Sequence, residues 1–526
     1  DLDGDGDCEI LYGSSDGKVY VMDHLGQELS GWPQSSKADL QGRYGFVVSP
    51  SVGDIDGDGA LEIVCGTLAG HLYAWELDGS VISGFPQYVG RSAKSVCAVV
   101  DIDDADDAAE IIVHGGKSEL WAMKGNGTAL SGYPLELGGD EDEFDSWIFA
   151  SSPIVLDLEL DGSLQIAVGS TSGEVYVFNT DGSVVDGWPV ATGDWVYSTV
   201  TPVDLDGDYE PEIVVASADG KVHAWNAAGE VVAGFPVTLD APVYGSVAAA
   251  DMTGDGANEL VVASSSGAVY MINKDGNFMS GWPTSPSATT FASPIIIDVN
   301  NDGALDVVLG AQNSALQAWS RNGELILSQV HEAGDWIDGT AVASDIDKDG
   351  LVELVFGAYD GKVYVIDLDT PATDANLAWP AFRGDRVRGA DAVSTDSDQD
   401  ELPDAFEMAQ FNGLEQSGAD DFDLDGVSNA NEWIAGTNAA SASDFFSVQL
   451  SYLPGEPSAS RRVRLTWNGV AGRCYTSWQC GQLDEGEEWE LADPESGTID
   501  CESTGEMSHE FDVSADDCFF RISVTR

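Results

Sequence analysis

The sequence has few basic residues and no long apolar run. Only 21 Lys and Arg stand against 92 Asp and Glu, which gives a formal net charge of −71. A chain this acidic repels the phosphates of nucleic acids and the anionic surfaces of lipid membranes. No stretch reaches the roughly 18 apolar residues that a membrane-spanning helix needs. We therefore expect no nucleic-acid partner and no membrane insertion, and we expect cations to neutralise the clustered carboxylates.

The sequence also lacks an initial Met, a recognisable signal peptide and any familiar catalytic motif. It begins at Asp1, inside an acidic repeat, so we interpret it as a fragment or a processed product. Gly-x-Ser-x-Gly and His-Glu-x-x-His are absent, and the six histidines do not cluster along the chain. The sequence therefore favours a protein that is not an enzyme.

Cysteine is scarce except near the C-terminus, where four of the seven cysteines lie between residues 474 and 518. Four cysteines in a short segment predict two disulfides with three possible pairings, in an oxidising compartment. A zinc site is the alternative, but the spacing lacks the close pairs of zinc ribbons. The cysteines concerned are Cys474, Cys480, Cys501 and Cys518.

What the sequence has in quantity is a repeat. The phrase Asp-x-Asp-Gly-Asp-Gly, or a close variant, occurs eight times, and five of the seven intervals are 47 residues. In a typical copy it is followed by a β-branched run, an alternating run, and an Asp-Gly or Asn-Gly turn. Most copies end in Gly-aromatic-Pro, such as Gly187-Trp188-Pro189. The phrase starts at Asp1, Asp54, Asp101, Asp157, Asp204, Asp251, Asp298 and Asp345.

Four short strands in each repeat of this length are typical of a β-propeller blade, whereas solenoid repeats are usually shorter and more uniform. We predict an all-β fold whose residues 1–392 form a propeller of seven or eight four-stranded blades. The first copy lacks an innermost strand of its own. That strand lies upstream, or residues 387–393 supply it and close the ring.

The acidic phrase has the composition of a calcium loop. Calcium prefers six to eight hard oxygen ligands, and carboxylates two residues apart on a tightly curled loop converge on one point. Glycines at positions 4 and 6 permit that curl, and an acid at position 9 completes the set. Magnesium is less suitable because it retains water ligands. The complete loops are Asp1, Asp3, Asp5 and Glu9; Asp54, Asp56, Asp58 and Glu62; Asp204, Asp206, Asp208 and Glu212; and Asp345, Asp347, Asp349 and Glu353.

Four loops depart from this set, and we expect them to bind calcium more weakly because they carry fewer charges or an altered spacing. The loop at 101 has one extra residue, the loop at 157 ends in Gln165, and the loop at 251 has Thr253 at position 3. Their candidate ligands are Asp101, Asp103, Asp106 and Glu110; Asp157, Glu159 and Asp161; Asp251, Asp255 and Glu259; and Asp298, Asn300, Asp302 and Asp306.

Residues 1 to about 390 resemble the FG-GAP (VCBS-type) repeats of integrin-α-like and bacterial surface propellers, on the acidic phrase and its regular spacing. The resemblance implies a propeller and several bound Ca²⁺ ions. It does not imply one function, because such propellers serve adhesion, ligand binding and enzyme scaffolding.

Two further acidic loops follow, each with oxygen ligands at positions 1, 3, 5 and 9 and Glu at 12, the EF-hand-type spacing. With the short helical runs predicted at 405–410 and 430–435, they resemble bacterial thrombospondin type-3-like repeats and, more loosely, dockerins. We predict a calcium module over 393–440 and a disulfide-containing β-sandwich over 441–526. The candidate ligands are Asp396, Asp398, Asp400, Asp404 and Glu407, and Asp421, Asp423, Asp425, Asn429 and Glu432.

A second repeated pattern, Asp beside Trp, precedes the innermost strand of several blades and indicates a binding surface. In a propeller these positions surround the channel mouth on the face opposite the metal loops. An indole ring can stack on a sugar while a carboxylate binds its hydroxyls, although packing of Trp between blades is the alternative. The candidate residues are Asp145 and Trp147, Asp194 and Trp195, and Asp335 and Trp336.

Together these features predict a calcium-stabilised binding or adhesion module of a secreted or cell-surface protein, with a glycan or an extracellular protein as its partner. One alternative is a polysaccharide lyase or hydrolase built on a calcium propeller. Another is the non-catalytic tail of a larger secreted enzyme.

Overall fold

The chain divides into two compact units, Asp1–Val393 and Ser394–Arg526, which are described separately. The computed structural model describes residues 2, 4, 6–36, 48–90, 92–93, 95–103, 108–115, 118–138, 150–159, 163–205, 210–285, 288–373, 376–382 and 422, and the backbone of the strands between 449 and 525. No helix that could span a membrane occurs within these residues.

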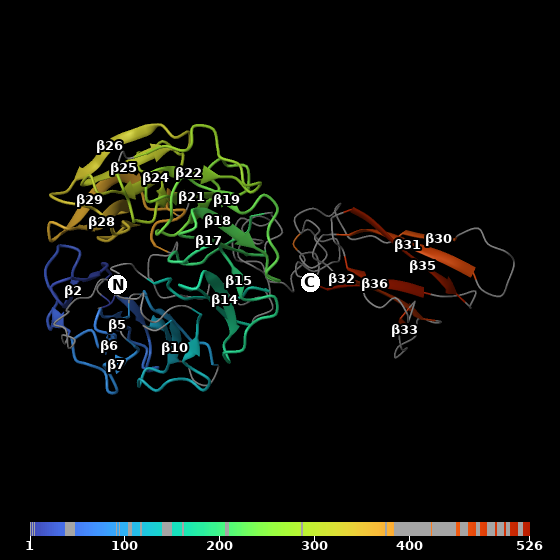
Figure 1. Cartoon of the computed structure of the whole chain (residues 1–526), viewed down its shortest axis with the longest axis horizontal. Coiled ribbons are helices and arrows are strands. Elements are labelled where there is room, and N and C mark those ends of the chain that lie inside the picture. Colours follow the sequence, from blue (N-terminus) through green and yellow to red (C-terminus); the bar gives the residue numbers. More distant parts are fainter. Residues whose placement is uncertain are drawn as a thin grey trace. The chain divides into compact units, whose positions relative to one another are not determined.

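The first unit consists of eight antiparallel sheets arranged around a ring, as Figure 1 shows. Each sheet is one blade, and strands that are consecutive in the chain pair within it. Blades 1 to 4 contain β1 Ile10–Gly13, β2 Lys18–Met22 and β3 Gln34–Ser35; β4 Ser51–Gly53, β5 Glu62–Gly66, β6 His71–Trp75 and β7 Gln87–Tyr88; β8 Ala98–Val100, β9 Glu110–Gly115, β10 Glu119–Met123 and β11 Leu135–Glu136; and β12 Ile154–Leu156, β13 Gln165–Gly169, β14 Glu174–Asn179 and β15 Val190–Ala191.

Blades 5 to 8 continue the same up-and-down order. They contain β16 Thr201–Val203, β17 Glu212–Ala216, β18 Lys221–Trp225 and β19 Val237–Thr238; β20 Ala248–Ala250, β21 Glu259–Ala263 and β22 Val269–Ile272; β23 Ile295–Ile297, β24 Asp306–Gly310, β25 Ala315–Ser320 and β26 Leu325–Glu332; and β27 Val342–Ser344, β28 Leu351–Ala358 and β29 Lys362–Pro371.

Burial explains the β-branched composition of the second strand in each blade. In β5 every residue is buried, because both faces of the sheet are covered by the neighbouring blades. The register is regular, with Val64 opposite Ala74 and Ile63 opposite Trp75. Apolar clusters fill seven joints between consecutive blades, for example the cluster that contains Val214 of blade 5 and Leu260 of blade 6. The core is therefore a set of layers between blades rather than one central mass.

Where a repeat ends in Gly-Trp-Pro, this ending joins its blade to the next one. The Nε1–H group of Trp188 donates a hydrogen bond of 2.9 Å to the carbonyl of Ala227, in the following blade. Gly187 before it has φ +89°, and a Cβ there would lie 2.1 Å from the carbonyl oxygen of Ala228, so only glycine fits. Equivalent indole bonds join Trp32 to Leu77 (2.7 Å) and Trp282 to Arg321 (3.0 Å).

The ring closes between blade 8 and blade 1, where the backbone N–H of Cys8 donates to the carbonyl of Ile346 at 2.8 Å. Beyond blade 8, the chain passes between two innermost strands. Trp379 exchanges two 2.9 Å backbone hydrogen bonds with Ile296 of β23, and Ala343 donates to the carbonyl of Pro380 at 2.8 Å. Trp379 also packs against the apolar clusters of blades 5 to 7, so this segment occupies part of the ring's centre.

In the second unit the described strands form two antiparallel sheets. One sheet has the order β30-β31-β35, and in the other β32 pairs with β33, β34 and β36. Their bounds are β30 Gln449–Tyr452, β31 Arg461–Gly469, β32 Cys474–Cys480, β33 Glu490–Leu491, β34 Ile499–Asp500, β35 Gly505–Val513 and β36 Phe519–Thr525.

The predicted fold class is confirmed, and of seven or eight blades the structure has eight. Five blades have four strands as expected, whereas blades 1, 6 and 8 have three among the described residues. The closing strand predicted at 387–393 and the short helices predicted at 405–410 and 430–435 lie outside the described residues. The domain limits 392 and 440 and the C-terminal disulfides stay predictions.

Candidate metal centres and binding surface

The seven acidic loops from blade 2 onward follow an innermost strand, and all eight loops are fastened by their ninth residue, which is the tenth in the longer loop at 101. That residue lies at the start of the second strand, and one of its side-chain oxygens accepts the backbone N–H of the loop's second residue at 2.5 to 3.2 Å. This bond occurs in all eight loops. The acceptors are Glu9, Glu62, Glu110, Gln165, Glu212, Glu259, Asp306 and Glu353.

The loop of blade 2 shows how the curl is maintained. Asp54 accepts backbone N–H bonds from Gly57 (2.7 Å) and Gly59 (2.8 Å), whose φ values are +76° and +87°. Asp58 accepts the N–H of Ala60 at 2.8 Å. These bonds gather carboxylate oxygens of Asp54, Asp56 and Asp58 within 4.8 Å of one another. The sequence prediction of converging carboxylates therefore holds for this loop.

Several of these carboxylates are buried without a compensating partner. Glu62 is 0% exposed, and its Oε1 atom has no hydrogen-bond partner. The Oδ1 atoms of Asp306 and Asp345 are also buried and also lack a hydrogen-bond partner. Burial raises the pKa of Glu62, Asp306 and Glu353 to about 7, and the neighbouring carboxylates add to the effect. An uncompensated buried carboxylate is costly, so the residues fit a site that a divalent cation completes.

The other loops are described to different extents. Groups with oxygens within 4.8 Å also occur at Asp101, Asp103 and Glu110, and at Asp345, Asp347 and Glu353. The loops at 251 and 298 repeat the curl: Asp251 accepts the N–H of Gly256, and Asp298 that of Gly303, both at 2.8 Å. Asp1, Asp3, Asp5, Asp106, Asp161, Asp206, Asp208 and the C-terminal candidates from Asp396 to Glu432 lie outside the described residues.

The predicted binding residues lie at the other end of the innermost strands. Trp195 precedes β16 by a few residues, whereas the loop at Asp204 follows that strand, so the two features belong to opposite ends of the blade. Asp194 and Asp335 are exposed, and each accepts the N–H of the Trp that follows it at 2.9 Å. Asp145 and Trp147 lie outside the described residues.

Trp195 does not stand alone but begins a row of rings. Trp195 contacts Tyr197 (centroids 5.6 Å apart), Tyr197 contacts Tyr244 (5.8 Å), and Tyr244 contacts Phe291 (5.4 Å). These four residues, here called the aromatic arc, precede the innermost strands of blades 5, 6 and 7. The sequence analysis missed three of them, although Tyr197, Tyr244 and Phe291 are spaced by 47 residues.

In blade 8 a second aromatic surface repeats the register of Trp195. Trp336 is 47% exposed and lies edge-on to Tyr359, with the ring centroids 6.3 Å apart and Tyr359 69% exposed. Large exposed rings are unusual at a position where packing alone is required. Trp336 is therefore not buried between blades.

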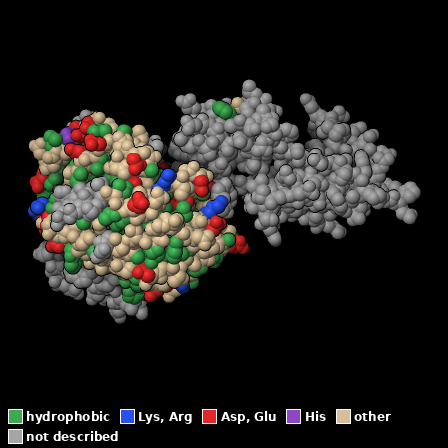
Figure 2. Space-filling model, turned by 90° about the horizontal axis from the view of Figure 1, so that it is seen from above, with side chains coloured by type: hydrophobic (Ala, Val, Ile, Leu, Met, Phe, Trp, Pro, Cys, Tyr) green, Lys and Arg blue, Asp and Glu red, His purple; other side chains and the backbone are tan. Residues whose placement is uncertain are grey.

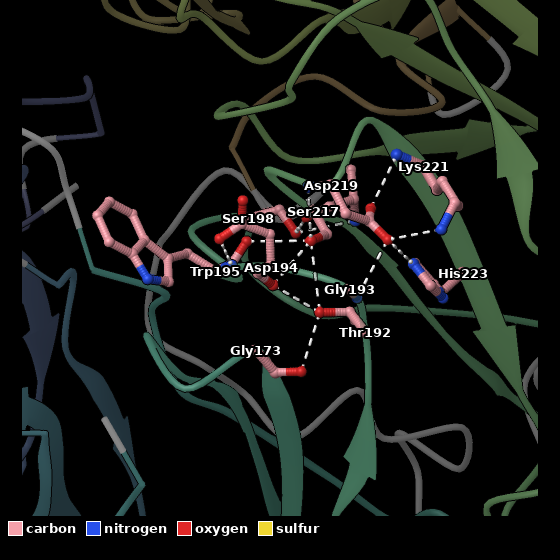
Figure 3. A network of polar contacts seen from close by, with 11 residues as sticks. Gly173, Thr192, Gly193, Asp194, Trp195, Ser198, Ser217, Asp219, Lys221 and His223 are labelled. Carbon is pink, nitrogen blue, oxygen red and sulfur yellow. Dashed lines mark hydrogen bonds and ion pairs between the residues drawn. The ribbon is translucent and has the colours of Figure 1, made fainter. Parts of the chain in front are cut away.

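An aspartate from the next turn of the same blade holds each Gly-Asp-Trp segment, as Figure 3 shows for blade 5. The Oδ2 atom of Asp219 accepts hydrogen bonds from the N–H of Gly193, the ammonium of Lys221 and the His223 ring, all at 3.1 Å. Burial alone would raise the pKa of Asp219, but His223 and Lys221 lower it below its ordinary value. The segment before Trp195 is therefore fixed by an ionised carboxylate.

In blade 8 an aspartate holds the Gly-Asp-Trp segment in the same way. The Oδ2 atom of Asp360 accepts hydrogen bonds from the N–H of Gly334 (3.1 Å), the hydroxyl of Tyr364 (2.6 Å) and the ammonium of Lys362 (3.2 Å). The Tyr364 hydroxyl is the largest of the effects that lower the pKa of Asp360 to about 2. The recurring phrase Asp-Gly-Lys-Val-(His or Tyr) was the sequence signal for these two anchors.

The described surface carries many acidic side chains and few basic ones, as Figure 2 shows. This distribution agrees with the net charge of −71. Any ligand of the exposed rings must therefore tolerate a negative field, which disfavours polyanions.

The fold defines the class: the first unit is an eight-bladed β-propeller. Residues 1–65 and 251–309 match the FG-GAP-like repeat family. Solved structures that match part of the chain include BamB from Moraxella catarrhalis, with a TM-score of 0.47 and 16% identity over 68% of this chain and 93% of that chain. BBS1N in complex with ARL6DN, soaked with lead, gives a TM-score of 0.42 and 16% identity over 66% and 96%. No curated protein sequence matches the chain.

Proposed function

We propose that this chain is a calcium-stabilised binding module of a secreted or cell-surface protein, and that its propeller holds a neutral glycan on the aromatic arc and on Trp336. The observation that carries the proposal is the continuous row of rings from Trp195 to Phe291 at one end of the innermost strands. In this proposal the chain binds its ligand without converting it.

Rings and carboxylates together suit a sugar. The faces of pyranose rings are apolar C–H surfaces that stack on indole and phenol rings, and their hydroxyls donate to carboxylates. Trp336 offers an exposed ring, and Asp335 beside it is held by the N–H of Trp336. The acidic surface disfavours sulfated or uronic-acid polymers, which leaves neutral glycans as the class of ligand.

Calcium has a structural role in this proposal. The ions would be held by the loop carboxylates such as Asp54, Asp56, Asp58 and Glu62, and they would supply positive charge where the chain concentrates negative charge. From blade 2 onward each loop joins the innermost strand to the second strand of its blade, so a bound ion would hold the connection between these two strands in place. An extracellular location, where calcium is abundant and disulfides form, agrees with this role.

The test is a glycan array with the wild-type chain, a Trp195→Ala variant and a Trp336→Ala variant. We expect retention of one or more neutral oligosaccharides by the wild type and at least a tenfold weaker signal for each variant. Leu25→Ala is the matched control, because Leu25 is 69% exposed and lies outside the aromatic surface. Equal retention by all four proteins, or retention of charged polymers only, would overturn the proposal.

A further inference from the structure

One acidic loop has the ammonium group of a lysine beside it. In blade 3, the ammonium nitrogen of Lys124 lies 2.8 Å from Oδ2 of Asp103 and 3.7 Å from Oε1 of Glu110. Both acids are among the residues predicted to bind calcium in that loop. Glu110 is 1% exposed, so its charge is removed from water and requires a nearby partner.

The position of Lys124 can be compared between blades. It is the first residue of the turn after the third strand, where its N–H donates to the carbonyl of the residue four places later. Seven blades share that hydrogen bond, and in six of them the residue is acidic or neutral. Those six residues are Asp23, Glu76, Asn179, Asn226, Asn273 and Ser320.

Blade 2 provides the sharpest contrast. Glu76 occupies the position of Lys124 there, so the two blades differ by two charges beside equivalent loops. Oε1 of Glu62 in blade 2 is buried without a hydrogen-bond partner, whereas Oε1 of its counterpart Glu110 faces the Lys124 ammonium. The equivalent buried carboxylates of the two loops therefore differ: the one in blade 3 faces a cation of the chain, and the one in blade 2 does not.

The charges account for the difference. An ammonium is a compact cation with three donors, and at these distances it attracts both carboxylates and offsets one of their two negative charges. A divalent cation bound in the same place would lie against the ammonium, and the repulsion between them would oppose binding.

We propose that Lys124 takes the place of the metal ion in blade 3, so that the loop at 101 is a calcium-independent site within a calcium-dependent ring. The inference rests on the calcium role proposed above, and it revises the expectation that Asp101, Asp103 and Glu110 bind calcium. Blade 3 would then keep its loop when calcium is depleted, while blade 2 would not.

The test counts bound calcium in paired variants of the full chain, by equilibrium dialysis followed by elemental analysis. At a calcium concentration near the dissociation constant of the loops, Asp56→Asn in blade 2 should bind less calcium than the wild type, because its loop loses one charge, and Asp103→Asn in blade 3 should bind the same amount. Lys124→Asn should bind one ion more, because it removes the ammonium that lies against Asp103 and Glu110. Lys274→Asn, an exposed lysine in the corresponding turn of blade 6, is the control and should change nothing.

The outcomes separate the two proposals. If the wild type binds no calcium, the calcium role itself is wrong. If the wild type binds calcium and Asp103→Asn binds less of it, as Asp56→Asn does, calcium occupies blade 3 and the Lys124 inference is overturned. If Lys124→Asn folds only in calcium, the ion has replaced the ammonium, which supports the inference. If it folds neither with nor without calcium, the comparison of Asp56→Asn with Asp103→Asn decides.

Discussion

The substitution Glu62→Gln should have opposite effects with and without calcium. Glu62 is fully buried, one of its oxygens accepts the N–H of Ile55 at 2.8 Å, and the other has no hydrogen-bond partner. A glutamine can retain the first bond, because Gln165 accepts the equivalent N–H of Leu158 at 2.7 Å in blade 4. The substitution therefore removes charge with little change in shape.

Without calcium, the variant should be the more stable protein at pH 8. Burial raises the pKa of Glu62 from 4.5 to about 7. At about 1.36 kcal/mol per pKa unit this shift amounts to roughly 3 kcal/mol, which water and salt at the open loop reduce to about 1 to 2 kcal/mol. Because the folded protein binds this proton more tightly, the wild type should lose that stability as pH rises from about 4.5 through 7.

With calcium, the order should reverse. An ion present at about 100 times its dissociation constant adds about 2.7 kcal/mol to the folded state, and the variant would lose most of this. Chemical denaturation at pH 8 and pH 5, each with calcium and with a chelator, measures both effects. Glu324→Gln, which removes an exposed charge outside the loops, is the control. Equal destabilisation of Glu62→Gln in calcium and in chelator would refute the reasoning.

Three further predictions concern the scaffold. Burial lowers the pKa of His114 to about 4, so the calcium-loaded protein should lose up to about 3 kcal/mol of stability as pH falls from about 6.5 to 4, and His114→Gln should remove this dependence in denaturation curves. Trp188→Phe should cost about 2 to 3 kcal/mol, because the smaller buried ring leaves a cavity and the bond to Ala227 is lost; an unchanged free energy of unfolding would contradict the role of Trp188 in joining the two blades. Peptide mapping without reductant should find Cys474, Cys480, Cys501 and Cys518 joined in two disulfides, and four free thiols in the secreted protein would contradict the sequence prediction.

The repeat made most of the fold predictable from sequence. A blade is a local structure: its strands are consecutive and its turns are marked by glycine, so the 47-residue spacing indicated the strands and the loops between them. The converging carboxylates of Asp54, Asp56 and Asp58 were predictable for the same reason, because all three belong to one short loop.

The contacts between repeats were not predictable in this way. Trp188 was visible as part of a repeated ending, but its partner Ala227 lies 39 residues further along the chain, in the next blade. The aromatic arc joins residues 47 apart, which touch only because neighbouring blades stand side by side. The passage of Trp379 beside Ile296 depends on ring closure and has no sequence signal of its own.

The sequence by itself therefore determined the kind of blade and the ligand chemistry of its loops, since both depend on residues that are close together in the chain. Only the tertiary structure decided which rings contact one another and which loop has a lysine beside it. Lys124 illustrates the physical reason. Its ammonium reaches Asp103 across 21 residues of a folded blade, and a charge's partner depends on distance in space rather than on position in the chain.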